Sequence, residues 1–95
     1  NKVRRSLMNG YMRTARLGGY DKQDVLMLID AYNQRIYELE LAINEKRSIG
    51  SFMPPPLPKK VRIGGFDVGD FDAYYSELRV KVVELEKKHR TIMAE

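Results

Sequence analysis

Apolar side chains recur at alternating steps of four and three residues in two separate stretches of the chain. The first stretch carries them at Val25, Ile29, Tyr32, Ile36 and Leu39. The second carries them at Phe71, Tyr75, Leu78, Val82 and Leu85. This spacing forms one apolar stripe along an α-helix and is the heptad pattern of a coiled coil. We therefore predict an all-α fold in which two long helices pack against each other along these ten positions, called the seam residues below.

Each predicted helix begins with the same arrangement of polar residues. Asp21 and Asp67 are N-cap candidates, because a short carboxylate can accept hydrogen bonds from the free N–H groups of the first turn. A second acid follows three residues later, at Asp24 and Asp70, where it favours the positive end of the helix dipole. Two glycines and an aromatic residue precede each cap, and the glycines supply backbone angles that other residues resist. The sequence therefore predicts a sharp turn before each helix.

These two units are an internal repeat. Residues 16–40 and 62–86 align without a gap at an offset of 46, and eight of the 25 aligned positions are identical. With 95 residues the chain forms one small domain. We divide it into repeat one at 13–47, a proline-rich linker at 48–61 and repeat two at 62–95. A further short helix is predicted near residues 2–12.

Charged residues beside the seam favour parallel helices. In a parallel pair Arg35 would meet Glu86 and Lys81 would meet Glu40, and both pairs are opposite in charge. The same arithmetic holds for a dimer, so the choice between pairing within one chain and pairing between chains stays open. The connection 48–64 has 17 residues and would reach about 53 Å in polyproline geometry, against about 39 Å for the first helix. That length favours a return strand and a parallel pair inside one chain.

Several function classes have no residues to support them. The chain has no cysteine and a single histidine, His89, which we interpret as a polar residue that sets the helix register or lies at a helix end. It has no phosphate-binding loop and no cluster of bases. We therefore expect a protein that is not an enzyme and has no metal and no cofactor. The prolines from Pro55 to Pro58 fit either a stiff spacer or a proline-rich ligand, and the spacer is the simpler interpretation.

Basic charge lies just before each glycine turn. The chain has a net charge of +4, and neither residues 1–20 nor residues 48–66 contain an acid. The bases close to the turns include Arg16, Lys59, Lys60 and Arg62. Such a patch suits an anionic membrane surface or nucleic acid, although a solvated basic face is the plain alternative. No RNA-binding signature accompanies it, so nucleic acid is not an expected partner.

The turn-and-seam unit resembles the N-terminal domain of the DivIVA/GpsB family of bacterial division and polarity scaffolds. In repeat one the residues that carry the resemblance are Gly19-Tyr20-Asp21, Asp24-Val25 and Leu28-Ile29-Asp30. In repeat two they are Gly65-Phe66-Asp67, Asp70-Phe71-Asp72 and Tyr74-Tyr75. The resemblance implies a scaffold at the cytoplasmic face of the membrane, with division or cell-wall proteins and further copies of itself as candidate partners. The alternative is a protein–protein adaptor that does not bind lipid.

The resemblance also implies candidate site residues. Family members expose an apolar residue and an arginine just before the Gly-Tyr pair, and here those places hold Leu17-Gly18 and Ile63-Gly64. The apolar residue is kept, whereas the arginine is found one step earlier, at Arg16 and Arg62. The expected membrane-facing set is therefore Arg16, Leu17, Lys59, Lys60, Arg62 and Ile63. The alternative is that Leu17 and Ile63 pack under the turn. Other family members bind arginine-rich peptides through the turn aromatic and two acids. Each repeat keeps the aromatic residue and one of the two acids, so the candidates are Tyr20, Asp30, Phe66 and Asp72.

Overall fold

The computed structural model describes residues 12–95. It contains the helices α2 (Lys22–Glu45) and α3 (Val68–Ala94), and within the described residues there is no strand, only isolated backbone bridges. The predicted fold class is confirmed to this extent: the described chain is all-helical, and its two helices pack against each other. The short helix predicted near residues 2–12 lies outside the described residues, apart from its last position.

Both helices begin as their sequences predict. The Asp21 carboxylate accepts a hydrogen bond from the Asp24 backbone N–H at 3.0 Å, and Asp67 accepts one from Asp70 at 3.0 Å. These contacts satisfy backbone donors that have no partner inside the helix. Lys46 caps the C-terminal end of α2, and its left-handed backbone turns its N–H back toward the Ala42 and Ile43 carbonyls.

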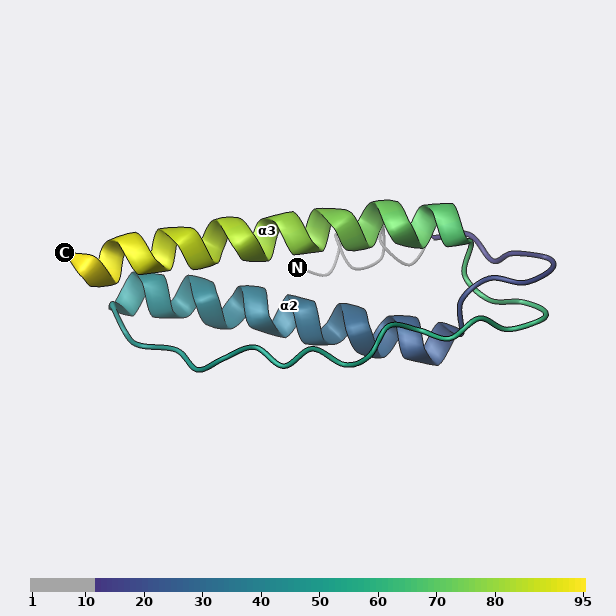
Figure 1. Cartoon of the computed structure of the whole chain (residues 1–95), viewed down its shortest axis with the longest axis horizontal. Coiled ribbons are helices and arrows are strands. Elements are labelled where there is room, and N and C mark those ends of the chain that lie inside the picture. Colours follow the sequence, from purple (N-terminus) through teal and green to yellow (C-terminus); the bar gives the residue numbers. More distant parts are fainter. Residues whose placement is uncertain (1–11) are drawn as a thin grey trace.

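The two helices are parallel and belong to one chain. Figure 1 shows α2 and α3 beginning at the same end of the molecule and running in the same direction. The rings of Tyr32 and Tyr75 meet edge to face at 5.4 Å. Arg35 forms an ion pair with Glu86 at 3.4 Å, as predicted for this orientation. The second predicted pair, Lys81 with Glu40, is not among the ion pairs of the described residues.

The seam residues form the core of the pair. Seven of them are buried: Val25, Ile29, Tyr32, Leu39, Phe71, Leu78 and Val82. The other three, Ile36, Tyr75 and Leu85, are half-buried against the same cluster. The core also contains buried residues that the seam does not include, namely Met12, Leu28, Phe66 and Tyr74. The core is therefore wider than a two-helix seam near the start of the helices.

The linker 48–61, called the strap below, returns along α2 (Figure 1). Every third residue of the strap is covered: Ile49, Phe52, Pro55, Pro58 and Val61. The residues between them are exposed. Three residues per turn is the period of polyproline II, so one edge of the strap faces the helices throughout. Phe52 packs edge to face on Tyr32 at 5.0 Å, and the Gly50 carbonyl accepts a hydrogen bond from Arg35 at 2.8 Å.

Candidate functional site

The candidate site is the end of the molecule where the segments 13–21 and 59–67 cross, called the crossed turns below. Each segment forms backbone hydrogen bonds with the other rather than with itself. The Tyr20 and Phe66 backbones exchange two hydrogen bonds, at 3.0 and 2.8 Å. The Asp21 N–H donates to the Lys59 carbonyl at 2.8 Å, and the Asp67 N–H donates to the Arg13 carbonyl at 2.7 Å. These partners are related by the repeat offset, so the site has an approximate two-fold symmetry.

The tips of the crossed turns are Leu17 and Ile63. They form an antiparallel backbone bridge and lie side by side. The Gly18 N–H donates to the Arg62 carbonyl at 2.6 Å, which ties one tip to the other. Both following residues, Gly18 and Gly64, have positive φ angles of 73° and 74°, a region that favours glycine and lets each tip reverse direction. The result is one blunt end built from both repeats (Figure 1).

Apolar surface at this end is open to solvent. The Leu17 side chain is 78% exposed and Ile63 is 73% exposed. A Leu or Ile exposed alone is ordinary on a protein surface. Here two such residues occupy equivalent positions and are held next to each other. They do not pack under the turns.

The basic residues of the site fall into two groups. Arg16, Lys60 and Arg62 are exposed and form no ion pair with any described residue. Lys59 instead binds the Asp24 carboxylate, with its Nζ 3.3 Å from Oδ2. Three of the four predicted basic residues are therefore available to bind an external anion. The fourth, Lys59, joins the strap to α2 through its ion pair with Asp24.

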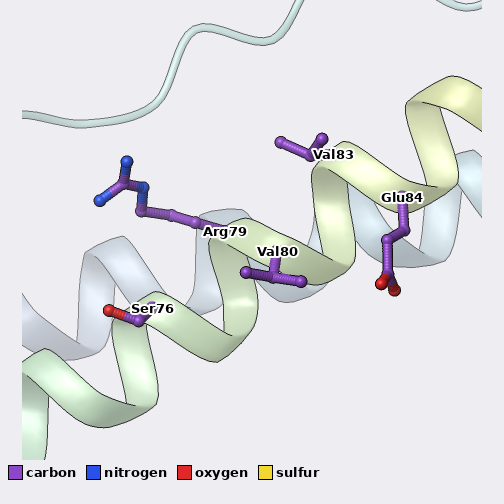
Figure 2. Close-up of a pocket in the computed structure, with 5 residues that line it drawn as sticks. All are labelled: Ser76, Arg79, Val80, Val83 and Glu84. Carbon is purple, nitrogen blue, oxygen red and sulfur yellow. The ribbon is translucent and has the colours of Figure 1, made fainter.

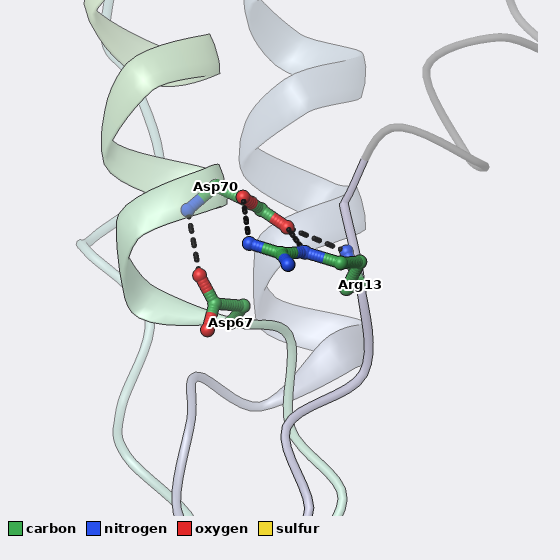
Figure 3. A network of polar contacts seen from close by, with 3 residues as sticks. All are labelled: Arg13, Asp67 and Asp70. Atoms are coloured by element: carbon green, nitrogen blue, oxygen red, sulfur yellow. Dashed lines mark hydrogen bonds and ion pairs between the residues drawn. The ribbon is translucent and has the colours of Figure 1, made fainter.

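The equivalent contact in the other repeat joins segment 13–21 to α3, and it is made by Arg13, which is not among the predicted site residues. Arg13 donates to Asp70 from its backbone N–H, Nε and Nη2 at 2.9, 2.9 and 3.1 Å (Figure 3). Arg13 lies 46 residues before Lys59, so the repeat offset alone identifies it as the equivalent of that lysine. Asp70 accepts these bonds while its own N–H donates to the Asp67 cap.

These contacts favour the ionised carboxylates. Hydrogen bonds from the Arg13 side chain, and then from its backbone N–H, lower the pKa of Asp70 below its ordinary value. The pKa of Asp24 is lowered chiefly by the hydrogen bond from the Lys59 backbone N–H. In return, Asp70 raises the pKa of the Arg13 guanidinium. The carboxylates of Asp24 and Asp70 are therefore ionised at neutral pH.

The candidate peptide-binding residues are divided between packed and exposed positions. The Tyr20 ring meets Phe71 edge to face at 5.1 Å, and Phe66 is buried with the Lys22 ammonium 5.1 Å above its ring. Asp30 and Asp72 are exposed on the helices. Both aromatic rings therefore already have partners within the chain.

Two further observations concern the described residues only. No group of His, Asp or Glu residues in this part of the chain is arranged to hold a metal ion. Neither α2 nor α3 is long and apolar enough to cross a membrane.

Comparison with protein-family models, with curated proteins and with solved structures gives no match for this chain.

Proposed function

We propose that this chain is a non-enzymatic scaffold module of the DivIVA type, which binds an anionic membrane surface through the crossed turns. The observation that carries the proposal is the exposure of Leu17 and Ile63, at 78% and 73%, side by side at one end of the molecule. The free cations Arg16, Lys60 and Arg62 lie in the same segments. Apolar tips together with cations suit the boundary between lipid headgroups and acyl chains.

The magnitudes are consistent with weak, reversible binding. Burying one Leu or Ile side chain contributes about 1.5–3 kcal/mol. Each Lys or Arg near an anionic leaflet adds about 1 kcal/mol. A pair of tips with three cations thus has enough attraction for salt-sensitive binding, and many copies on a shared scaffold would strengthen it.

The parallel helices give this binding a direction. Because α2 and α3 both begin at the crossed turns, the opposite end of the pair points away from the proposed membrane contact (Figure 1). The helix faces and the far end then remain accessible to division or cell-wall proteins. This arrangement is what a peripheral scaffold at the inner face of a cell membrane requires.

Flotation with liposomes tests the proposal. We expect the protein to float with vesicles that contain anionic lipid, to float less as salt rises, and to stay at the bottom with neutral vesicles. The variant Leu17→Glu/Ile63→Glu should not float with either. The matched control is Met53→Glu/Leu57→Glu, which places two carboxylates at strap positions that are 86% and 67% exposed.

The outcomes separate the two candidate functions. Loss of flotation in the tip variant and not in the strap variant supports the membrane proposal. Equal loss in both variants would mean that net charge alone decides, and the tips would have no specific role. No flotation of the unmodified chain at low salt contradicts membrane binding and leaves the protein–protein adaptor as the function to test.

A further inference from the structure

A second surface lies along the exposed side of α3, and at Arg79 and Val83 it borders a hollow that Tyr32 and Arg35 of α2 also line. Val80 and Val83 are 56% and 60% exposed there, although both are branched apolar residues. With Ser76 they continue the four-and-three spacing of a heptad stripe, which we call the outer stripe. An open hollow of about 360 Å³ borders it, lined by Ser76, Arg79, Val80, Val83 and Glu84 (Figure 2).

Opposite charges flank the outer stripe. Figure 2 shows Arg79 and Glu84 extending from α3 on either side of Val80. Neither side chain forms an ion pair with a described residue, and the Arg79 guanidinium lies 5.5 Å from the centre of the Tyr75 ring. The two residues are five positions apart, which is the separation at which flanking residues meet across a parallel helix pair.

The interior of this molecule already contains a contact of that kind. Arg35 on α2 is the repeat equivalent of Lys81, and Lys81 lies five positions before Glu86 on α3. Arg35 and Glu86 form an ion pair at 3.4 Å across the parallel seam. On the outer stripe, a second α3 that packs in parallel would bring residues five positions apart together in the same way. Arg79 of each copy would then meet Glu84 of the other, with the valines between them.

We propose that the outer stripe is the contact surface for a second copy of this chain, which packs α3 against α3 in parallel. Such a contact is isologous, so each charge pair occurs twice. It places the crossed turns of both copies at the same end of the dimer. The inference goes beyond the proposed membrane function and does not depend on it.

Charge also limits the contact, so the dimer is weak. The next residue of the stripe after Val83 is Lys87, which would face its own copy. Before Val80, Asp72 would lie opposite Glu77 of the partner. The favourable part is therefore confined to about two helical turns, far less than a standard stable interface. We expect dissociation constants in the range of about 0.1 to 1 mM.

Sedimentation equilibrium between about 10 µM and about 1 mM measures this association. The mean mass of the unmodified chain should rise from monomer toward dimer over that range, and Val80→Glu/Val83→Glu should stay monomeric. The matched control is Tyr37→Glu, because Tyr37 is the repeat equivalent of Val83 and is also 60% exposed. That variant should associate like the unmodified chain.

A charge exchange tests the register. Arg79→Glu and Glu84→Arg should each weaken association, since each places like charges opposite each other in its own dimer. An equal mixture of these two variants should associate again, because both contacts become opposite in charge. Lys87→Leu should raise the dimer fraction. Circular dichroism on each variant confirms that the helices are intact.

Three results would overturn the inference. One is an unmodified chain that stays monomeric at the highest concentration. Another is a dimer that survives Val80→Glu/Val83→Glu, which would place the contact on another face. The last is a folded pair of charge variants whose mixture does not associate more than either alone.

Discussion

Gly19 and Gly65 touch backbone to backbone where the two turns cross. A Cβ atom at Gly65 would lie 2.6 Å from the carbonyl carbon of Gly19, and one at Gly19 would lie 2.8 Å from the Gly65 carbonyl carbon. Real Cβ atoms essentially never come so close to backbone atoms. The two repeats can therefore cross at this point only because neither has a side chain there.

This contact predicts a large effect of a single methyl group. Gly65→Ala should lower the free energy of unfolding by about 2 kcal/mol, the cost of an overpacked site that cannot move away. Gly19→Ala should cost about 3 kcal/mol, since Gly19 also has a φ of 95°. Urea denaturation followed by circular dichroism measures both. Gly50→Ala is the control: beyond its chain neighbours, nothing lies within 4 Å of the place its Cβ would occupy, so the change should stay within about 1 kcal/mol.

The strap covers Arg35 but leaves its repeat equivalent, Lys81, exposed to solvent. Arg35 is 7% exposed, donates to the Gly50 carbonyl, pairs with Glu86 and lies 5.4 Å from the Phe52 ring centre. Its repeat equivalent, Lys81, is exposed. We expect Arg35→Ala to lower the free energy of unfolding by about 2 kcal/mol, because it leaves a carbonyl and a partly covered carboxylate without their partner. Lys81→Ala should cost less than about 0.5 kcal/mol. Equal effects of the two substitutions in urea denaturation would contradict this assignment.

Local sequence signals account for much of the fold. Asp21 and Asp67 mark the helix starts because capping depends on residues within one turn of each other. The heptad spacing identifies the seam because it follows from the geometry of a single helix. The Arg35–Glu86 contact was also predictable, since the charge pattern and the linker length both favour parallel pairing.

Other features depend on contacts that no local pattern records. Leu28 and Tyr74 are buried beside the seam where Met12 and Phe66 join the core. The crossing of the turns is formed by backbone hydrogen bonds, which leave no side-chain signature. The predicted Lys81–Glu40 pair does not form in the described chain, whereas its counterpart at Arg35 lies beneath the strap. The internal repeat indicates equivalent positions but does not reveal which of them become covered.

The Asp24 and Asp70 carboxylates, which join the crossed turns to the helices, predict a loss of stability at acidic pH. Hydrogen bonds from Arg13 hold the pKa of Asp70 below its ordinary value in the folded chain. Such a group stabilises the fold fully above its unfolded pKa, near 4, and this contribution is lost as pH falls through the lower folded pKa. Unfolding free energy should therefore drop below about pH 4, and Asp70→Asn should flatten that drop.

The symmetric site provides the comparison for Asp70. Asp24→Asn should flatten the acid-induced drop as well, because the Lys59 backbone N–H lowers the pKa of Asp24. Asp30→Asn is the control, since Asp30 is exposed and forms no ion pair with a described residue. If Asp30→Asn changed the pH dependence as much as Asp70→Asn, general charge repulsion would explain the drop instead.

Tyr32 predicts an effect at the opposite end of the pH scale. Burial, together with the Tyr75 hydroxyl 3.4 Å from its own, raises the pKa of Tyr32 to about 12. The folded state favours the neutral phenol, so the stabilising contribution is complete below the unfolded pKa of about 10 and is lost as pH rises toward 12. Titration of phenolate absorbance should show a late step that Tyr32→Phe removes. Tyr37→Phe should leave that step in place, because Tyr37 is 60% exposed and lies outside the core. A late step that survives Tyr32→Phe would assign it to another tyrosine and would contradict the burial of this hydroxyl at the seam.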